Sequence, residues 1–254
     1  QIRNNKVEII GTDVNHIKNV LRASVGEKLE ICDSSTKQDY LCEIENITKE
    51  NIMCNIIEKL KTNVESDVQI TVFQGLPKAD KMELIIQKSV ELGVYDIIPV
   101  EMKRSIVKLK ENDKTKKLLR WQKISEVAAK QCGRNIIPEI KPIINVKNIC
   151  NFIPEYDIVL VAYEKEEKNK LKEAIQLLER KKEDNKILKI AVVIGPEGGI
   201  DEQEIHLLEG SGAQIVTLGK RILRTETVAL NMLSILMYEL EDWYKFVEGR
   251  RKNE

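Results

Sequence analysis

Two glycine-bearing loops near the end of the chain carry the residue types that could do chemistry. The first spans residues 195–199 (GPEGG) and follows an apolar run; the second spans residues 218–227 (LGKRILRTET) and follows another short apolar run. Each loop lies where a buried strand is predicted to end and a helix to begin. Ligands gather at such places in open α/β sheets, because backbone N–H groups and helix N-termini are free there. The two loops therefore predict a pocket for a small polar molecule.

The two loops offer different groups to a ligand. Glycines let the backbone approach a ligand closely, and Asp201 with Glu204 predicts a capping box for the helix that follows the first loop. The second loop places Arg221 and Arg224 among apolar side chains, which suits a flat ring beside an anion. The alternatives are a tight turn without a ligand for the first loop and pairing of the arginines with Glu226 for the second. Neither a dinucleotide nor a triphosphate fingerprint is present.

The elements around these loops indicate an α/β domain. From residue 68 onward, predicted strands (69–73, 96–100, 157–162, 188–194 and 214–218) alternate with predicted helices (78–92, 114–130, 168–182, 202–209 and 225–244). Continuous apolar strands are typical of a parallel sheet covered on both faces, and the alternation indicates a doubly wound fold. The last helix is apolar almost all round, so either its own domain or a second subunit must bury it.

The first 65 residues follow a different pattern. Apolar and polar residues alternate in several short runs, which indicates half-buried antiparallel strands of a small β-barrel-like domain. One short helix is expected over residues 13–21, with Thr12 or Asp13 as its N-cap. The polar stretch 61–67 marks a boundary, so we expect one domain over residues 1–66 and a second over residues 67–254.

Composition excludes several function classes. The 254 residues are 42% hydrophobic, yet no apolar run approaches the ~20 residues that a membrane span needs, and no signal peptide is visible. The five scattered cysteines show no C-x-x-C spacing and are accompanied by only two histidines, so we expect no metal site. An odd number of cysteines without a framework suits a reducing cytoplasm.

Charge is balanced overall but not locally. The chain has 41 basic and 41 acidic residues, whereas residues 101–134 hold eleven basic and four acidic ones, a net charge of +7. A basic segment in a neutral protein is typical of phosphate binding. The alternative is an ordinary solvated helix face.

Several motifs together resemble a known family. They are residues 16–22 (HIKNVLR), 77–78 (PK), 88–94 (KSVELGV), 104–105 (RS), 128–134 (AAKQCGR), 194–199 (IGPEGG) and 218–227 (LGKRILRTET). This set is similar to the SPOUT class of RNA methyltransferases, and specifically to the bacterial enzymes that methylate N3 of one uridine in 16S ribosomal RNA. The resemblance covers nearly the whole chain. Two departures are Val228, where the family more often has Ala, and the absence of the basic and aromatic segment with which the family usually opens, so part of the RNA-contacting surface is expected to be missing here.

The resemblance implies a fold, a cofactor and an assembly. The first domain would be a PUA-like RNA-binding β-barrel, and the second would carry a trefoil knot, an exception to the usual rule against knots. S-adenosyl-L-methionine would lie bent in that knot. The implied cofactor-binding residues are Ala162, Glu164, Ile194, Gly195, Glu197, Gly199, Leu218, Gly219, Ile222 and Leu223. The protein would act as a cytoplasmic homodimer on 16S ribosomal RNA or the assembled 30S subunit, without a metal or a membrane.

The chemistry of N3 methylation suggests roles for individual residues. Uracil N3 becomes a nucleophile only after losing its proton, so the enzyme must remove that proton and stabilise the anion. We expect Arg224 to stabilise the anion, with Arg134 as a second contact to base or phosphate. Glu226 is either the proton acceptor or the residue that orients Arg224. The expected RNA-binding residues are His16, Lys18, Arg22, Arg104 and Lys108.

Three other functions remain open at this point. A ribose 2′-O-methyltransferase of the same fold would differ in the nucleoside that it produces. An inactive RNA-binding or ribosome assembly factor would not bind S-adenosylmethionine. A nucleotide-phosphate enzyme on a flavodoxin-like sheet would bind a free mononucleotide, although the phosphate-loop signature is missing.

Overall fold

The computed structural model describes residues 2–3, 5–33, 36, 38–60, 65–181 and 187–241. These residues form two compact units, and the chain divides between residues 64 and 65. Each unit has its own sheet and its own core, and each is described separately below.

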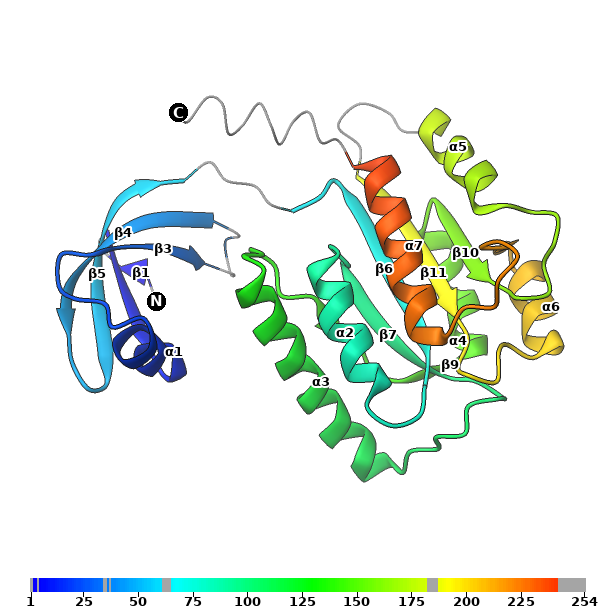
Figure 1. Cartoon of the computed structure of the whole chain (residues 1–254), viewed down its shortest axis with the longest axis horizontal. Coiled ribbons are helices and arrows are strands. Elements are labelled where there is room, and N and C mark those ends of the chain that lie inside the picture. Colours follow the sequence, from blue (N-terminus) through cyan, green and yellow to red (C-terminus); the bar gives the residue numbers. More distant parts are fainter. Residues whose placement is uncertain are drawn as a thin grey trace. The chain divides into compact units, whose positions relative to one another are not determined.

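The N-terminal unit is a five-stranded antiparallel sheet (Figure 1). Its strands are β1 (Ile2–Arg3), β2 (Lys6–Ile10), β3 (Lys28–Asp33), β4 (Gln38–Ile47) and β5 (Asn51–Lys59), in the order β1-β2-β5-β4-β3. The alternating pattern puts Cys42, Ile44, Ile52 and Cys54 into a small core, as a sheet with one buried face requires. The strands predicted from the alternation are confirmed.

One helical segment follows β2. Helix α1 (Thr12–Asn15) continues into a π-helical turn, η1 (His16–Val20). The predicted helix is thus present, but its predicted cap is wrong. Gly11 occupies the N-cap position with φ 74°, and no side chain caps the helix.

The C-terminal unit is built on a seven-stranded sheet. Its strands are β6 (Val68–Gly75), β7 (Asp96–Glu101), β8 (Glu139–Ile140), β9 (Ile144–Asn145), β10 (Ile158–Ala162), β11 (Leu188–Ile194) and β12 (Gln214–Val216). The order is β12-β10-β11-β6-β7-β8, with β9 also paired to β7, and the pairings are parallel. The α/β class and the five long strands are confirmed, whereas the two-residue strands β8 and β9 were not predicted.

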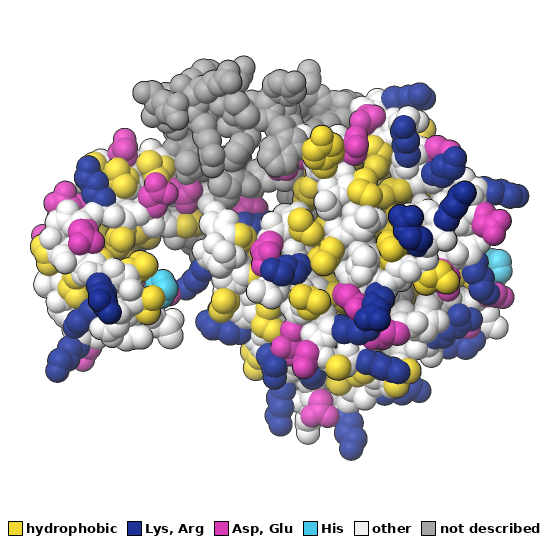
Figure 2. All heavy atoms as spheres, viewed as in Figure 1, with side chains coloured by type: hydrophobic (Ala, Val, Ile, Leu, Met, Phe, Trp, Pro, Cys, Tyr) yellow, Lys and Arg dark blue, Asp and Glu magenta, His cyan; other side chains and the backbone are white. Residues whose placement is uncertain are grey.

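Helices cover both faces of this sheet. They are α2 (Lys81–Glu91), α3 (Glu111–Gln131), α4 (Val146–Phe152) with the 3₁₀ turn η2 (Ile153–Glu155), α5 (Leu171–Lys181), α6 (Glu202–Gly210) and α7 (Thr225–Leu240). Successive strand residues point to opposite faces, and two core clusters result: one with α2, α3, α5 and α7, the other with α4 and α6. Only α4 was not predicted, and residues 182 and 242–244 of two predicted helices lie outside the described residues. Lys and Arg are interspersed with Asp and Glu over the helices' outer faces (Figure 2).

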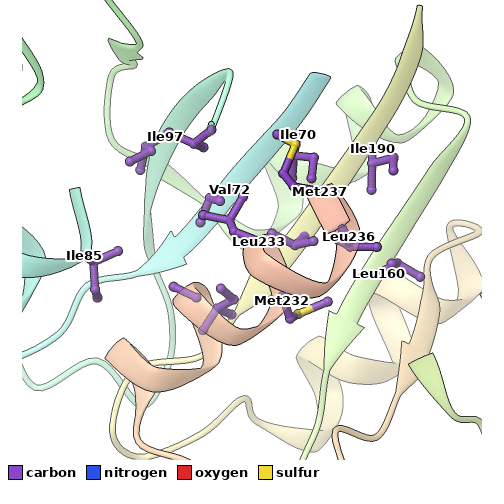
Figure 3. Packing of buried hydrophobic residues seen from close by; sticks show 14 of the residues in the cluster. Ile70, Val72, Ile85, Ile97, Leu160, Ile190, Met232, Leu233, Leu236 and Met237 are labelled. Carbon is purple, nitrogen blue, oxygen red and sulfur yellow. The ribbon is translucent and has the colours of Figure 1, made fainter. Parts of the chain in front are cut away.

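The apolar last helix is buried by its own chain. Met232, Leu233, Leu236 and Met237 of α7 are each at most 7% exposed, and they pack against Ile70 and its neighbours in the sheet (Figure 3). Its outward side carries Thr227, Ser234 and Tyr238. Burial within its own domain, one of the two alternatives, therefore accounts for its composition. No helix in the described part of the chain is long and apolar enough to cross a membrane.

Candidate functional site

Three strand ends frame a cavity of about 490 Å³. The cavity lies beyond Ala162 of β10, Ile194 of β11 and Val216 of β12, and its volume is typical of small-molecule sites. Strand β10 pairs with both β11 and β12, so the two glycine-bearing loops do not leave adjacent strands. The loop after β10, with Tyr163 and Glu164, completes the wall between them.

Every residue expected to bind the cofactor lines this cavity. They are Ala162, Glu164, Ile194, Gly195, Glu197, Gly199, Leu218, Gly219, Ile222 and Leu223. The large aliphatic side chains among them offer apolar surface for a ring, and the glycines leave backbone groups accessible. Ile222 is 86% exposed, so its side chain is accessible to solvent at the mouth of the cavity. The lining fits a molecule with one flat apolar part and one polar part.

The loop of residues 195–199 is shaped by its glycines. A Cβ on Gly195 would lie 2.9 Å from Ile200, and Gly199 has φ +70° with a carboxylate oxygen of Glu164 2.6 Å from where its Cβ would be. The loop is closed by a hydrogen bond from Gly199 N to Pro196 O of 2.9 Å. The predicted capping box between Asp201 and Glu204 is confirmed at the start of α6.

Two arginines stand at the rim without a partner of their own. Arg221 and Arg224 line the cavity and are exposed, and neither makes an ion pair or a side-chain hydrogen bond with any described residue. Guanidinium groups in this position are free to meet an anion supplied from outside. The alternative in which these arginines pair with Glu226 at the helix start is wrong for the described chain.

Glu226 instead pairs with a residue that the sequence did not indicate. Its Oε2 lies 3.5 Å from Nζ of Lys81, in the first turn of α2, and has no hydrogen-bond partner although it is buried. Glu226 does not line the cavity, whereas Lys81 does. The described residues thus show no contact through which Glu226 could orient Arg224. Lys81 was missed because only the fold brings the start of α2 beside the two loops.

Lys81 also pairs with Glu197 of the glycine-bearing loop, at 3.0 Å. This hydrogen bond is the main cause that raises the pKa of Lys81 above its usual value. Burial acts to raise the pKa of Glu197, but hydrogen bonds from its own N–H, from Lys81 and from the N–H of Lys78 outweigh it and lower that pKa. The pair is therefore charged at neutral pH.

Arg134 is not at the cavity. Its guanidinium donates to Glu65 at 2.7 Å and to the carbonyl oxygens of Val90 and Val94 at 3.1 and 2.7 Å, and its side chain is 8% exposed. Its N–H groups are thus engaged within the domain, where they tie the end of α2 to the start of the domain. The expected contact of Arg134 with the base or a phosphate is not supported by this arrangement.

Charge around the basic segment is largely compensated in three dimensions. At least six of its eleven cations pair with carboxylates, and three of these carboxylates lie outside the segment. The pairs are Lys103–Asp201, Arg104–Asp201, Lys114–Glu101, Arg120–Glu83, Lys123–Glu126 and Arg134–Glu65. Arg104 also donates to Gly198 O at 3.4 Å, so it supports the glycine-bearing loop. Lys108 is exposed and has no partner among the described residues. For α3, the solvated-face alternative describes much of what is seen.

The remaining RNA candidates share one short segment of the N-terminal unit. His16, Lys18 and Arg22 are all exposed on and just after η1, beside the exposed side chains of Val20 and Leu21. A basic segment with exposed apolar side chains offers both charge and contact surface to a nucleic acid.

Cysteine chemistry plays no part in the described site. The five cysteines are free, and burial raises the pKa of Cys42 to about 11. In the described residues, no group of three or more His, Cys, Asp or Glu is arranged to hold a metal ion.

Comparison with known proteins connects both units to RNA modification. The RNA methyltransferase domain family matches residues 64–237, and the RNA methyltransferase PUA domain family matches residues 9–57. Ribosomal RNA small subunit methyltransferase E of Bacillus subtilis (strain 168) is 36% identical over 233 residues, covering 92% of this chain and 90% of that protein. The chain belongs to the ribosomal RNA small subunit methyltransferase E family.

Solved structures agree with this membership. A family member from Neisseria gonorrhoeae, solved bound to S-adenosyl methionine, superposes with a TM-score of 0.81 at 32% identity over 95% of this chain and 96% of that one. A Legionella pneumophila methyltransferase, solved with the same cofactor, gives 0.76 at 32% identity over 93% of both chains. The resemblance seen in the sequence motifs is thereby confirmed, as are the PUA-like domain and the methyltransferase domain.

Proposed function

We propose that this family member transfers a methyl group from S-adenosyl-L-methionine to N3 of one uridine in 16S ribosomal RNA. The observation that carries the proposal is the cavity at the ends of β10, β11 and β12, which unites all ten expected cofactor-binding residues with two unpaired arginines at its rim. Relatives of the family are named for the small-subunit ribosomal RNA, and two solved relatives contain the methyl donor.

The cavity suits the donor in its shape and lining. Ile194, Leu218, Ile222 and Leu223 would hold the adenine, and the exposed backbone of Gly195 and Gly219 would read its edge. Glu164, which has no partner among the described residues, would accept hydrogen bonds from ribose hydroxyls. When bound, the donor supplies an electrophilic methyl group on a sulfonium.

The target base would meet charged groups at the cavity. Arg224 is unpaired and would stabilise the negative charge that the uracil carbonyls gain when N3 loses its proton. Arg221 would hold a neighbouring phosphate, with His16, Lys18, Arg22, Arg104 and Lys108 as further RNA contacts. We propose Glu226 as the final acceptor of the N3 proton, because Arg224 is not its partner.

The further properties implied by the family resemblance are proposed on the same basis. They are a homodimer with RNA contacting both subunits, a trefoil knot around the cavity, and action in the cytoplasm on ribosomal RNA or the 30S subunit. Light scattering tests the dimer directly, and methylation of naked RNA against assembled subunits identifies the substrate.

The decisive experiment is methylation of ribosomal RNA from cells that lack the enzyme, with labelled donor and nucleoside analysis by mass spectrometry. We expect N3-methyluridine, and we expect Arg224→Ala to abolish it while leaving calorimetric donor binding within a few-fold. A 2′-O-methylated nucleoside would support the ribose methyltransferase instead. Absence of binding heat with the donor would support an inactive assembly factor.

A further inference from the structure

A charged cluster connects the cavity to a carboxylate, that of Glu226, whose Oε2 atom is buried. Lys81 Nζ lies 3.0 Å from Oε1 of Glu197 and 3.5 Å from Oε2 of Glu226. The three groups come from α2, from the loop after β11 and from the first turn of α7. Lys81 and Glu197 line the cavity, and Glu226 does not. Lys81 therefore stands between the ligand space and Glu226.

The two carboxylates have different hydrogen-bonding states. Both oxygens of Glu197 accept from the backbone N–H of Lys78, at 3.1 and 3.2 Å, and Oε1 also contacts Lys81. Oε2 of Glu226 is buried and has no hydrogen bond. An acceptor of this kind has unused capacity, because its contact with Lys81 is a 3.5 Å ion pair and a buried carboxylate oxygen without a hydrogen bond is costly to keep. Glu197 anchors the lysine, whereas Glu226 can still take up a proton.

The charge of the cluster suits proton uptake. One ammonium and two carboxylates sum to −1, so the cluster becomes neutral when it gains one proton. An ammonium has three N–H donors, of which two face Glu197 and Glu226. The other charged residues that line the cavity are Glu164, Lys220, Arg221 and Arg224.

We propose that Lys81 is a catalytic residue that relays the N3 proton of the target uracil to Glu226. Lys81 first passes one of its own protons to Oε2 of Glu226, which leaves a lone pair on Nζ. The N3–H bond then breaks as a new N–H bond forms at that lone pair. The N3 electron pair then bonds to the donor's methyl carbon, and the carbon–sulfur pair stays on sulfur. This inference rests on the proposed function, because it requires an acceptor atom that carries a proton.

The relay explains why the resting lysine is charged. The hydrogen bond to Glu197 raises the pKa of Lys81, so little neutral amine is present. Lys81 would therefore be ineffective at neutral pH if it acted as a direct general base. In a relay, one proton leaves Lys81 toward Glu226 before the N3 proton arrives, and Lys81 ends with the same charge as it began.

The test compares Lys81→Arg, Lys81→Met and Glu226→Gln in single-turnover methyl transfer. Arginine keeps the positive charge and can reach both carboxylates, but a guanidinium does not give up a proton in proteins. We expect each variant to lose about 10²–10⁴-fold in rate, the typical contribution of a proton-transfer group. Donor affinity, measured by calorimetry, should stay within a few-fold for Lys81→Arg. The matched control is Lys88→Met on the same helix, which removes an ion pair with Glu91 outside the cavity and should change neither quantity.

The pH dependence separates a relay from mere positioning. At alkaline pH, N3 loses its proton without help, so the rates of Lys81→Met and Glu226→Gln should rise about tenfold per pH unit where the wild-type rate is flat. If Lys81→Met fails to fold, Lys81→Arg carries the test. Near wild-type rates for Lys81→Arg, or no alkaline recovery of Glu226→Gln, would overturn the relay. A wild-type enzyme that forms no N3-methyluridine would instead overturn the proposed function.

Discussion

Thr225 donates its hydroxyl hydrogen to the carbonyl oxygen of Gly195 over 2.7 Å, and so joins the first turn of α7 to the glycine-bearing loop. The same hydroxyl accepts a hydrogen bond of 2.9 Å from the side chain of Gln74 on β6. Thr225 is 5% exposed and Gln74 is fully buried. One hydroxyl therefore connects the central strand, the loop and the last helix beneath the cavity.

Thr225→Val should loosen this connection. Valine has nearly the same shape but removes the partner of the Gly195 carbonyl and of one N–H of the Gln74 amide, whose nitrogen also donates to the Gly75 carbonyl. Each buried polar group left unsatisfied costs about 1–3 kcal/mol. We expect a lower free energy of unfolding in urea and weaker binding of the methyl donor. Thr227→Val, at an exposed position on the same helix, is the control and should leave stability unchanged. Equal effects from the two variants would contradict the role given to Thr225.

Gly199→Ala should weaken donor binding more than it destabilises the fold. Alanine at φ +70° is strained by roughly 1–2 kcal/mol, and its Cβ would displace the carboxylate of Glu164 from 2.6 Å. Because Glu164 lines the cavity, the wall of the site moves with it. Calorimetric titration with the donor measures the effect. Gly210→Ala at the end of α6 is the matched control, since its added Cβ would meet nothing within 4 Å.

Arg134→Met should cost stability and leave the chemistry of the folded fraction intact. The substitution leaves the carboxylate of Glu65, 13% exposed, without its guanidinium, and breaking a buried pair costs about 3–5 kcal/mol. Chemical unfolding gives the loss, and methyl transfer per folded molecule gives the activity. Lys116→Met, an exposed position on α3, serves as control. A loss of rate without a loss of stability would restore Arg134 as a contact for RNA.

Tyr156→Phe should make stability less dependent on pH above pH 10. Burial raises the pKa of Tyr156 to about 12 from its usual 10. Because the folded-state pKa is the higher one, the stabilisation is fully present below pH 10 and is lost as the pH rises toward 12. The loss amounts to at most about 3 kcal/mol at ~1.4 kcal/mol per unit, and to less once solvent screening of this partly exposed tyrosine is included. The free energy of unfolding, measured with urea, should decrease more between pH 9 and pH 11.5 for the wild type than for the phenylalanine variant. Equal decreases would show that ionisation of Tyr156 is not the cause.

Sequence reasoning located the cavity because strand ends and glycine-bearing loops are local features. Gly195, Leu218 and the other expected lining residues lie at the end of a strand or in the loop that follows it, and parallel strands bring their carboxyl ends to one edge. It could not find Lys81, whose two carboxylate partners lie more than a hundred residues away along the chain. It also missed the order of β10, β11 and β12, since apolar runs do not specify which strands pair.

Ion pairing shows the same limit. Counting charges along residues 101–134 suggested a strong positive field, but Arg120 and Arg134 are neutralised by Glu83 and Glu65 from other parts of the domain. Arg134 belongs to the motif of residues 128–134, on which the family resemblance partly rests. Its buried contacts indicate that this arginine stabilises the fold. Counting charges along a stretch of sequence does not reveal such ion pairs, because the partners come together only after folding.

The hydrogen bond between Gln74 and Thr225 joins residues 151 positions apart in the chain. During synthesis, β6 leaves the ribosome long before α7 does, and the floor of the cavity is missing until that last helix emerges. A nascent chain stopped before residue 225 would hold most of the sheet yet have no complete place for a methyl donor. The protein thus becomes competent for its ligand only after α7 has been synthesised.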